Sequence, residues 1–500
     1  MLPVRLFISV FQFGDFLTLA DIERNALHRP VERTIGKLNT QFQLDPLGRL
    51  KQQIAQPNGH NKADPAVLIG RSYQYDTTGN LVRTDDQTNG SRDYTYDALG
   101  RITQSADEHY RYDPAHNLTD GSRIGGNRLT QYQGTSYRYD PLGNLIEKQQ
   151  HDGEIQYYRY NADNQLTEAE VHRPGQNAVL YRYRYDPIGR RIAKVHPNGN
   201  EIQYLWDGSR LLQEYRKDCT YTYVYTEDQN YEPLAQITTY NGTDKAREIL
   251  YYHNDQIGIP REMTDGEGKI VWSGDYSGWG KLTQESRLKL DIHQPFRLQN
   301  QHYDEETGLH YNFFRYYEPD AGRFVNQDPI GLEGGENLYA FAPNAQEWVD
   351  PLGLARKSIS SRLPEGSRTG QFGPKNGKLT KLDPQTRKPI QIRSYDARGN
   401  PIKDIDFGHN HGFGDPHAHD WRYPSDKAPN KVRGEGRVLT KAEKLHLKLG
   451  KCAQAFSGLT SLSTRFIGGI GLLLLPNSIS QCQDLYYSMK NPDKCGAKNK

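Results

Sequence analysis

The chain has 500 residues, of which 35% are hydrophobic, with 47 glycines, 34 tyrosines, four cysteines and a formal net charge of +2. So few aliphatic side chains exclude an ordinary aliphatic core, and the four scattered cysteines exclude a disulfide framework. The length allows a long repeat array together with a smaller domain.

The charge is distributed unevenly along the chain. From Ala355 onwards there are 26 Lys and Arg residues against 12 Asp and Glu, whereas residues 1–354 hold 37 against 49. An acidic body therefore carries a basic C-terminal module, which we expect to meet a polyanion. The alternative is that the basic residues only keep the module soluble or pair it with the acidic body.

The N-terminal sequence MLPVRLFISVFQFGDF is interrupted by Arg5 and Asp15. It therefore lacks the charged-then-apolar order of a signal peptide, and we expect it to enter strand structure directly.

A repeated unit follows, in which a Tyr-x-Tyr segment leads into a turn such as Asp-Pro-Leu-Gly-Asn and then an aliphatic residue. Its anchors recur at intervals typical of a repeat array. They are Asp45, Asp76, Asp97, Asp113, Asp140, Asn161 and Asp186.

Each unit specifies its own local structure. Alternate tyrosines lie on one face of a strand, since strand side chains repeat every two residues. Aspartate bonds its own backbone, proline fixes φ, and glycine or asparagine accepts a positive φ. Every repeat is thus predicted to be a β-hairpin with an aromatic face, stacked on its neighbours in a sheet.

The pattern from Asp45 to Leu354 resembles the Rhs/YD-repeat family of polymorphic toxins. The segments YYHNDQIGIPREMTDGEGKIVWSGDYSGWGKL and QPFRLQNQHYDEETGLHYNFFRYYEPDAGRF are similar to the Rhs-associated core. The resemblance implies a spiralling, cocoon-like β-shell, incomplete if the repeats are too few to close it. It also implies three parts: a YD-repeat array in residues 1–250, the core in 251–354 and a variable toxin in 355–500. The alternative is a repeat scaffold for adhesion or carbohydrate binding.

The core ends in two related turns, at Asp328 and Asp350. In the Rhs family such a pair belongs to an autoprotease, which implies cleavage between Leu354 and Ala355, with Arg315 orienting or polarising the groups. Two adjacent carboxylates suit this chemistry, because one stays protonated as an acid while the other activates water. On spacing alone, both turns are plain turns like those upstream.

The C-terminal module is predicted to be a small α+β domain. Residues 391–396 and 402–407 alternate like the strands of a hairpin. Two histidine pairs follow, His409 with His411 and His417 with His419, accompanied by Asp406. Spacing of i, i+2 places both imidazoles of a pair on one face of a strand, and the Gly/Pro segment between can fold one pair toward the other.

Two catalytic mechanisms fit these histidines. In a metal-independent ribonuclease, one imidazole takes a proton from the ribose hydroxyl and another protonates the leaving oxygen. In a metal-dependent nuclease, the histidines and an aspartate hold a divalent ion such as Zn²⁺ or Mg²⁺. A purely structural zinc site also fits the pattern, as does a histidine-rich loop without chemistry.

The residues after the histidines favour single-stranded nucleic acid, since aromatic rings stack on bases and guanidiniums track the backbone. The candidates are Trp421, Arg422, Tyr423, Arg433 and Arg437, although ordinary surface packing explains them too. The tail beyond Thr440 is predicted to be helical. Its apolar run from Phe466 to Leu475 is short and glycine-rich for a bilayer span, which favours a buried helix over a pore.

The sequence therefore predicts an Rhs-family effector in bacterial competition whose released C-terminal domain is a nuclease, RNA being preferred to DNA as substrate. The implied partners are an immunity protein and a type VI or related injection apparatus. The implied location is the producer's cytoplasm and then that of the target cell. A metal-dependent DNase, a pore-former and a non-enzymatic adhesin are the competing hypotheses.

Overall fold

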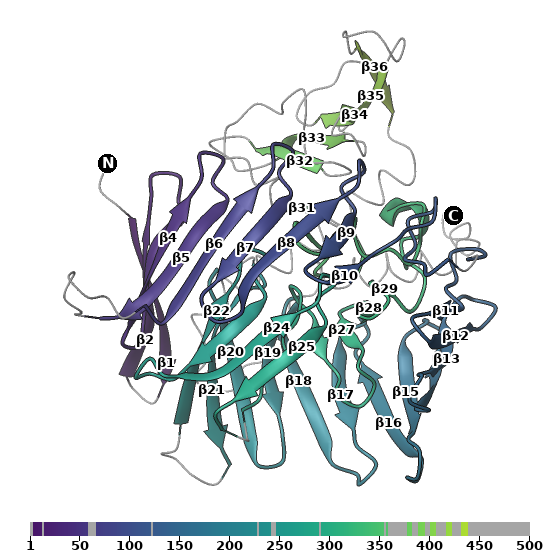
Figure 1. Cartoon of the computed structure of the whole chain (residues 1–500), viewed down its shortest axis with the longest axis horizontal. Helices are drawn as coiled ribbons and strands as arrows, with labels where there is room; N and C mark the ends of the chain where they lie inside the picture. The colour runs from purple at the N-terminus through teal and green to yellow at the C-terminus, as the bar shows by residue number, and fades with distance from the viewer. Residues whose placement is uncertain are drawn as a thin grey trace, which may run out of the picture.

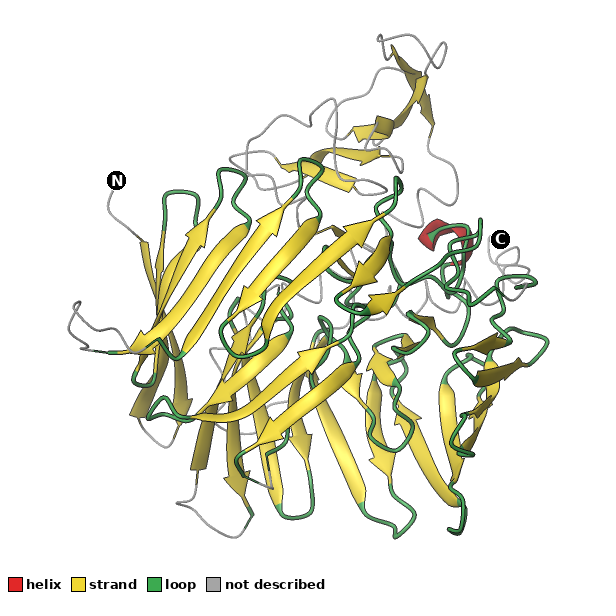
Figure 2. Ribbon diagram, in the orientation of Figure 1, coloured by secondary structure: helices red, strands yellow, loops and turns green. Residues whose placement is uncertain are grey.

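In the computed structural model the described part of the chain is mainly β-structure, with one short 3-10 turn, η1 (Gly331–Gly334) (Figure 2). This confirms the mainly β prediction. The residues described are 4–12, 15–58, 67–121, 124–227, 230–241, 247–289, 292–354, 357–358, 378–382, 389–395, 401–406, 417–422 and 432–438.

The first sheet has ten antiparallel strands in chain order (Figure 1). They are β1 (Val4–Gln12), β2 (Asp15–Arg24), β3 (Pro30–Ile35), β4 (Leu38–Leu44), β5 (Leu50–Pro57), β6 (Ile69–Tyr75), β7 (Leu81–Asp86), β8 (Gly90–Tyr96), β9 (Ile102–Ser105) and β10 (Glu108–His109).

The second sheet has fifteen antiparallel strands, again in chain order. They are β11 (Gln131–Tyr132), β12 (Thr135–Tyr139), β13 (Leu145–Gln149), β14 (Ile155–Tyr160), β15 (Leu166–His172), β16 (Val179–Tyr185), β17 (Arg191–Val195), β18 (Glu201–Asp207), β19 (Arg210–Tyr215), β20 (Cys219–Tyr225), β21 (Pro233–Tyr240), β22 (Arg247–Asn254), β23 (Pro260–Thr264), β24 (Ile270–Tyr276) and β25 (Leu282–Arg287). Among the strands described, neither sheet pairs its first strand with its last, so both sheets are open. The second sheet runs without a break through residue 250, where the sequence suggested the start of the core.

The predicted turn chemistry is present in the repeats. At Asp97, Oδ1 accepts hydrogen bonds from the backbone N–H groups of Leu99 (2.9 Å) and Arg101 (3.0 Å). The N–H of Gly100, whose φ is 76°, bonds the Asp97 carbonyl at 3.0 Å. His116 and Asn164 adopt the same positive φ in repeats that lack this glycine.

Neighbouring repeats are joined by tyrosine hydroxyls. The Tyr96 hydroxyl donates to the Leu81 carbonyl at 2.7 Å, which ties the end of one hairpin to the start of the strand before it. The same contact links Tyr75 to Leu50, Tyr112 to Ile102, Tyr185 to Leu166, Tyr225 to Leu211 and Tyr276 to Pro260. A backbone carbonyl thereby gains a side-chain donor in each of these six repeats.

One repeat differs from the predicted hairpin. Around Asp113 the turn forms, but its flanks make only a single bridge, between Tyr112 and Leu118. The reason is its position: it lies between β10 and β11, where the first sheet ends and the second begins.

The two sheets also pack face to face. Leu19, Ile22 and Ile35 of the first sheet form a core with residues of β21 and β22, including Leu234 and Ile237. Buried ion pairs add to this contact, since Arg71 on β6 reaches both Asp86 on β7 and Glu262 on β23. The chain thus folds back over itself, and stacking rather than strand pairing joins the layers.

Residues 292–354 pack against both sheets inside this arrangement (Figure 1). Asn344 donates to the Gly100 carbonyl of the first sheet, and the Tyr339 hydroxyl donates to the Gly143 carbonyl of the second, each at 2.8 Å. The strands here are β26 (His302–Tyr303), β27 (His310–Asn312), β28 (Arg315–Glu318), β29 (Arg323–Phe324) and β30 (Trp348–Val349), which pairs with β31 (Lys357–Ser358). Residues 292–354 therefore form a core that the two large sheets share.

Further along, a five-stranded antiparallel sheet contains the hairpin predicted from the sequence. Its strands are β32 (Lys378–Leu382), β33 (Pro389–Tyr395), β34 (Pro401–Asp406), β35 (His417–Arg422) and β36 (Val432–Val438). The described part of this region is β-structure, while the predicted helical tail lies outside the described residues. Within the described part of the chain, no helix is long and apolar enough to cross a membrane.

The tyrosine contacts predict a specific loss of stability. Tyr96→Phe leaves the Leu81 carbonyl without its donor, so the free energy of unfolding should fall by about 1–3 kcal/mol in urea denaturation. Tyr215→Phe is the control, because that residue is 38% exposed and its hydroxyl makes a solvent-exposed hydrogen bond to the Gln213 side chain; a change within about 0.5 kcal/mol is expected there. Equal losses of stability in both variants would contradict a structural role for the tyrosine hydroxyl contacts.

Buried His253 on β22 predicts acid sensitivity. Burial, reinforced by Arg33 and Arg71, holds the pKa of His253 well below its usual 6.5. The unfolded chain therefore binds the proton first. The contribution of His253 to the free energy of unfolding is fully present above pH 6.5. Below that pH the contribution falls by about 1.4 kcal/mol per pH unit. Urea denaturation at pH 7 and pH 5 should show His253→Gln losing less stability than the parent chain; equal losses would contradict the assignment.

Candidate functional site

The two turns at the end of the core have the backbone geometry of the upstream repeats. Asp328 Oδ1 accepts from the N–H of Ile330 at 3.1 Å, and Asp350 Oδ1 accepts from the N–H of Leu354 at 3.0 Å. Gly331 and Gly353 follow with positive φ values of 58° and 64°. The interpretation as turns is therefore correct, but their surroundings differ.

In the repeats, the second carboxylate oxygen has a local partner. A side chain four residues after the aspartate donates to Oδ2 in six turns, from Arg49, Asn80, Arg101, Asn117, Asn144 and Arg190. In the two core turns that position holds Leu332 or Leu354, which cannot donate. Both Oδ2 atoms instead face one remote arginine.

That arginine is Arg315, at the start of β28 and 2% exposed. Its Nη2 lies 3.1 Å from Asp328 Oδ2 and 3.5 Å from Asp350 Oδ2. The guanidinium also donates through Nη1 to the Leu338 carbonyl at 3.0 Å and through Nε to the Gly353 carbonyl, and stacks on the Phe324 ring. The structure thus brings together the three residues predicted for autoproteolysis.

The Leu354 carbonyl lies beside this cluster. A Cβ atom on Gly334 would lie 2.1 Å from Asp328 Oδ2 and 2.9 Å from the Leu354 oxygen, so both atoms border the same glycine. Ala355, the other side of the predicted cleavage site, lies outside the described residues. Only a residue without a side chain fits at position 334 as the structure stands.

Three residues that the sequence did not single out hold the last turn. Asn312 donates to the Asp350 carbonyl at 2.8 Å, Asn300 donates to the Pro351 carbonyl at 2.6 Å, and the Phe314 N–H bonds the Leu352 carbonyl at 3.3 Å. Asn312 precedes Arg315 in the HYNFFRYY segment, and that closeness is the only sequence signal for it.

A second cluster lies on the five-stranded sheet. In the register of β34 with β35, Asp406 pairs with His417 and Asp404 pairs with His419, so all four share one face. The His417 and His419 rings are 5.0 Å apart, which confirms that both imidazoles of this pair lie on the same side. The sequence pattern placed this pair correctly.

Asp406 is the centre of that cluster. His419 Nε2 lies 3.5 Å from Asp406 Oδ2, while Gln391 on β33 donates to Oδ1 at 2.8 Å. Asp406 and His417 are buried, and one ligand atom from each of Asp406, His417 and His419 lies within 4.8 Å of the others. Two imidazoles and a carboxylate at this separation can act as proton donors and acceptors or hold a divalent ion.

The remaining predicted residues are only partly visible. Trp421 and Arg422 lie on β35 and Arg433 and Arg437 on β36, where Trp421 pairs with Arg433 and Ala418 with Arg437. His409, His411 and Tyr423 lie outside the described residues. Their part in a nucleic-acid site stays a prediction.

The family model for the teneurin YD-shell matches residues 31–337. The chain belongs to this family, as its Rhs/YD-repeat pattern predicted. Among solved structures, the crystal structure of TcdB2-TccC3-TEV is similar with a TM-score of 0.50 and 18% identity, over 69% of this chain and 20% of that one. This likeness concerns the fold alone.

Curated relatives match part of this chain, and their names give different activities. The double-stranded DNA deaminase toxin A of Burkholderia cenocepacia is 38% identical over 70% of this chain and 27% of its own length. The probable deoxyribonuclease RhsA of Dickeya dadantii is 31% identical over 69% and 24%, and the tRNA3(Ser)-specific nuclease WapA of Bacillus spizizenii is 30% identical over 61% and 11%. The chain thus spans about a quarter or less of the length of these relatives.

Proposed function

We propose that the chain is an Rhs toxin that cuts itself after Leu354 and releases a nuclease. The cut is supported by the convergence of Arg315, Asp328 and Asp350 beside the Leu354 carbonyl. One aspartate, ionised as a carboxylate, takes a proton from water as the water oxygen attacks the carbonyl carbon of Leu354. The other gives a proton to the departing Ala355 nitrogen, which leaves as a free amine.

Arg315 acts on both carboxyl groups in this scheme. Its guanidinium forms ion pairs with both carboxylates and is itself held by hydrogen bonds to the Leu338 and Gly353 carbonyls. Since Gly353 is the residue before Leu354, the same side chain aligns the chain to be cut with the groups that cut it.

The cleavage proposal predicts a single uncut chain in three variants. Asp328→Asn and Asp350→Asn each remove one acid or base, worth roughly 10²–10⁴ in rate. Gly334→Ala places a methyl group on the Asp328 carboxylate, and a shift of that group by about 1 Å costs about 100-fold. Denaturing gels of freshly made protein measure the cut fraction.

Gly266→Ala is the matched control, because a Cβ there meets no atom within 4 Å. It should cleave like the parent chain. Normal cutting in both aspartate variants would refute the autoprotease.

We infer that the nuclease lies in residues 355–500 and uses Asp406, His417 and His419. The observation that carries this is the placement of the two imidazoles on one face beside a buried carboxylate held by Gln391. One imidazole takes a proton from the ribose 2′-hydroxyl and the other protonates the leaving 5′-oxygen, while Asp406 orients His419. The excess of basic residues after Ala355 suits a phosphate backbone.

RNA is the substrate we propose, since a pair of imidazoles suits transfer to and from a 2′-hydroxyl that DNA lacks. A metal-dependent DNase is the second candidate. It is favoured by the same three residues as a ligand set and by the deoxyribonuclease name of one relative. In that case Asp406, His417 and His419 would hold a divalent ion that activates water.

The partners and location follow from this function. A nuclease made in the cytosol attacks its maker, so an immunity protein should bind it, and a type VI or related apparatus should inject it into the cytoplasm of a target cell. The body in residues 1–354 would carry the cut domain until then.

Controlled expression of the full chain in a bacterium tests the nuclease, with cellular RNA, DNA and membrane potential followed together. RNA should be degraded by the parent chain and spared, by roughly 10²-fold or more in rate, with His417→Ala or His419→Ala. His109→Ala, at an exposed histidine on β10, is the control and should leave degradation unchanged.

Degraded DNA with intact RNA would support the metal-dependent DNase instead. Loss of membrane potential with both nucleic acids intact would refute a nuclease and support a pore.

A further inference from the structure

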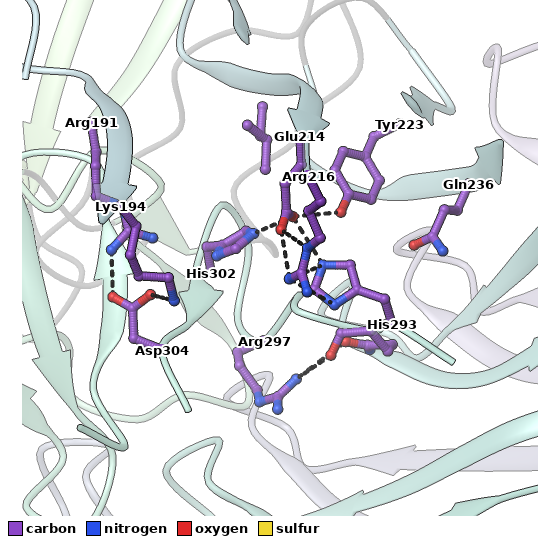
Figure 3. A network of polar contacts seen from close by, with 12 residues as sticks. Arg191, Lys194, Glu214, Arg216, Tyr223, Gln236, His293, Arg297, His302 and Asp304 are labelled. Carbon is purple, nitrogen blue, oxygen red and sulfur yellow. Dashed lines mark hydrogen bonds and ion pairs between the residues drawn. The ribbon is translucent and has the colours of Figure 1, made fainter. Parts of the chain in front are cut away.

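A third polar cluster lies in the body, away from both sites above, and joins a sheet strand to the core segment. Glu214 comes from β19, whereas His293 and His302 come from the segment that enters the core (Figure 3). Glu214 is fully buried and His302 is 5% exposed. A buried carboxylate facing two imidazoles is a common set of metal ligands.

The three groups converge on one oxygen. Glu214 Oε2 lies 2.9 Å from His293 Nε2 and 3.4 Å from His302 Nε2, and the Tyr223 hydroxyl donates to the same oxygen at 3.1 Å. Ligands bonded to zinc at about 2.0–2.1 Å in a tetrahedron lie about 3.3 Å from one another. The cluster therefore has nearly the ligand separations of a zinc site before any ion enters.

Buried His302 supplies an independent observation. Among the described residues, neither of its ring nitrogens makes a hydrogen bond of good geometry, although the ring is enclosed by Tyr204 and Phe296. A buried polar group without a good hydrogen bond destabilises the folded chain. A metal ion bound at Nε2 would remove part of that destabilisation.

Arg216 is the competing cation, and it also approaches one of the proposed ligands, since its Nη2 lies 3.4 Å from His293 Nε2. Its Nε and Nη2 both reach Glu214 Oε1 at 2.7 Å, which leaves Oε2 to the imidazoles. Carboxylates that bind a metal through one oxygen usually accept a hydrogen bond at the other. The Arg216 side chain is 36% exposed, so it can also move toward solvent if the ion repels it.

We propose that Glu214, His293 and His302 form a zinc-binding site, with the Tyr223 hydroxyl as the fourth ligand. The ion ties β19 of the fifteen-stranded sheet to residues 293–302. That segment leads directly into β26–β28 and Arg315. Zinc here is structural, because all four ligands come from the protein and no position stays open for a substrate.

Zinc binding by the full chain tests this. The background has His409, His411, His417 and His419 all changed to Ala, so that the C-terminal cluster takes up no ion. Metal-stripped protein is titrated with Zn²⁺ alone, and bound zinc per chain is measured by elemental analysis. His293→Gln and His302→Gln should each lose one zinc per chain, or bind it more than about tenfold more weakly.

His253→Gln is the matched control, since His253 is equally buried but has only Thr264 as a side-chain partner. It should retain the ion, and Zn²⁺ should raise its thermal unfolding midpoint but not that of His302→Gln. Equal zinc content and equal midpoint shifts in His253→Gln and His302→Gln would overturn the site. So would a background chain that binds no zinc.

Discussion

Each aspartate turn of this protein fixes one carboxylate oxygen on its own backbone and leaves the second to another donor. In six repeats that donor is the side chain four residues later, so the turn is self-contained. At Asp328 and Asp350 a leucine occupies that position, and the second oxygen faces Arg315. The change of one residue type in a structural turn thus turns the second carboxylate oxygen toward a distant arginine.

Asp255 supports the same principle elsewhere in the body. Ile259 stands four residues later, and the carboxylate interacts instead with the guanidiniums of nearby Arg261 and of remote Arg71 on β6. A buried carboxylate needs a cation or several donors, so the loss of the local partner requires a long-range one. Long-range pairs of this kind also join the sheets, as with Arg71 and Glu262.

The segment 292–354 connects these features. It contacts both sheets, contributes aromatic residues to the largest core cluster and contains all three autoprotease candidates. The stacked sheets hold this segment on several sides, and β31, from beyond Leu354, adds a strand pair to β30 next to Asp350. This suits a family whose relatives share a shell and differ in the activity that their names give.

The local units were predictable from the amino-acid order: the tyrosine strands, the Asp-Pro-x-Gly turns, the hairpin before His417 and the shared face of His417 and His419. These depend on strand periodicity and on hydrogen bonds within a few residues, which a sequence displays directly. Folding in three dimensions was needed to bring Gly334 to Asp328, Gln391 to Asp406, and Glu214 to His293 and His302. Those contacts join residues far apart in the chain, or depend on the exact shape of a turn, and they form only when the sheets stack and close-packing brings their side chains together.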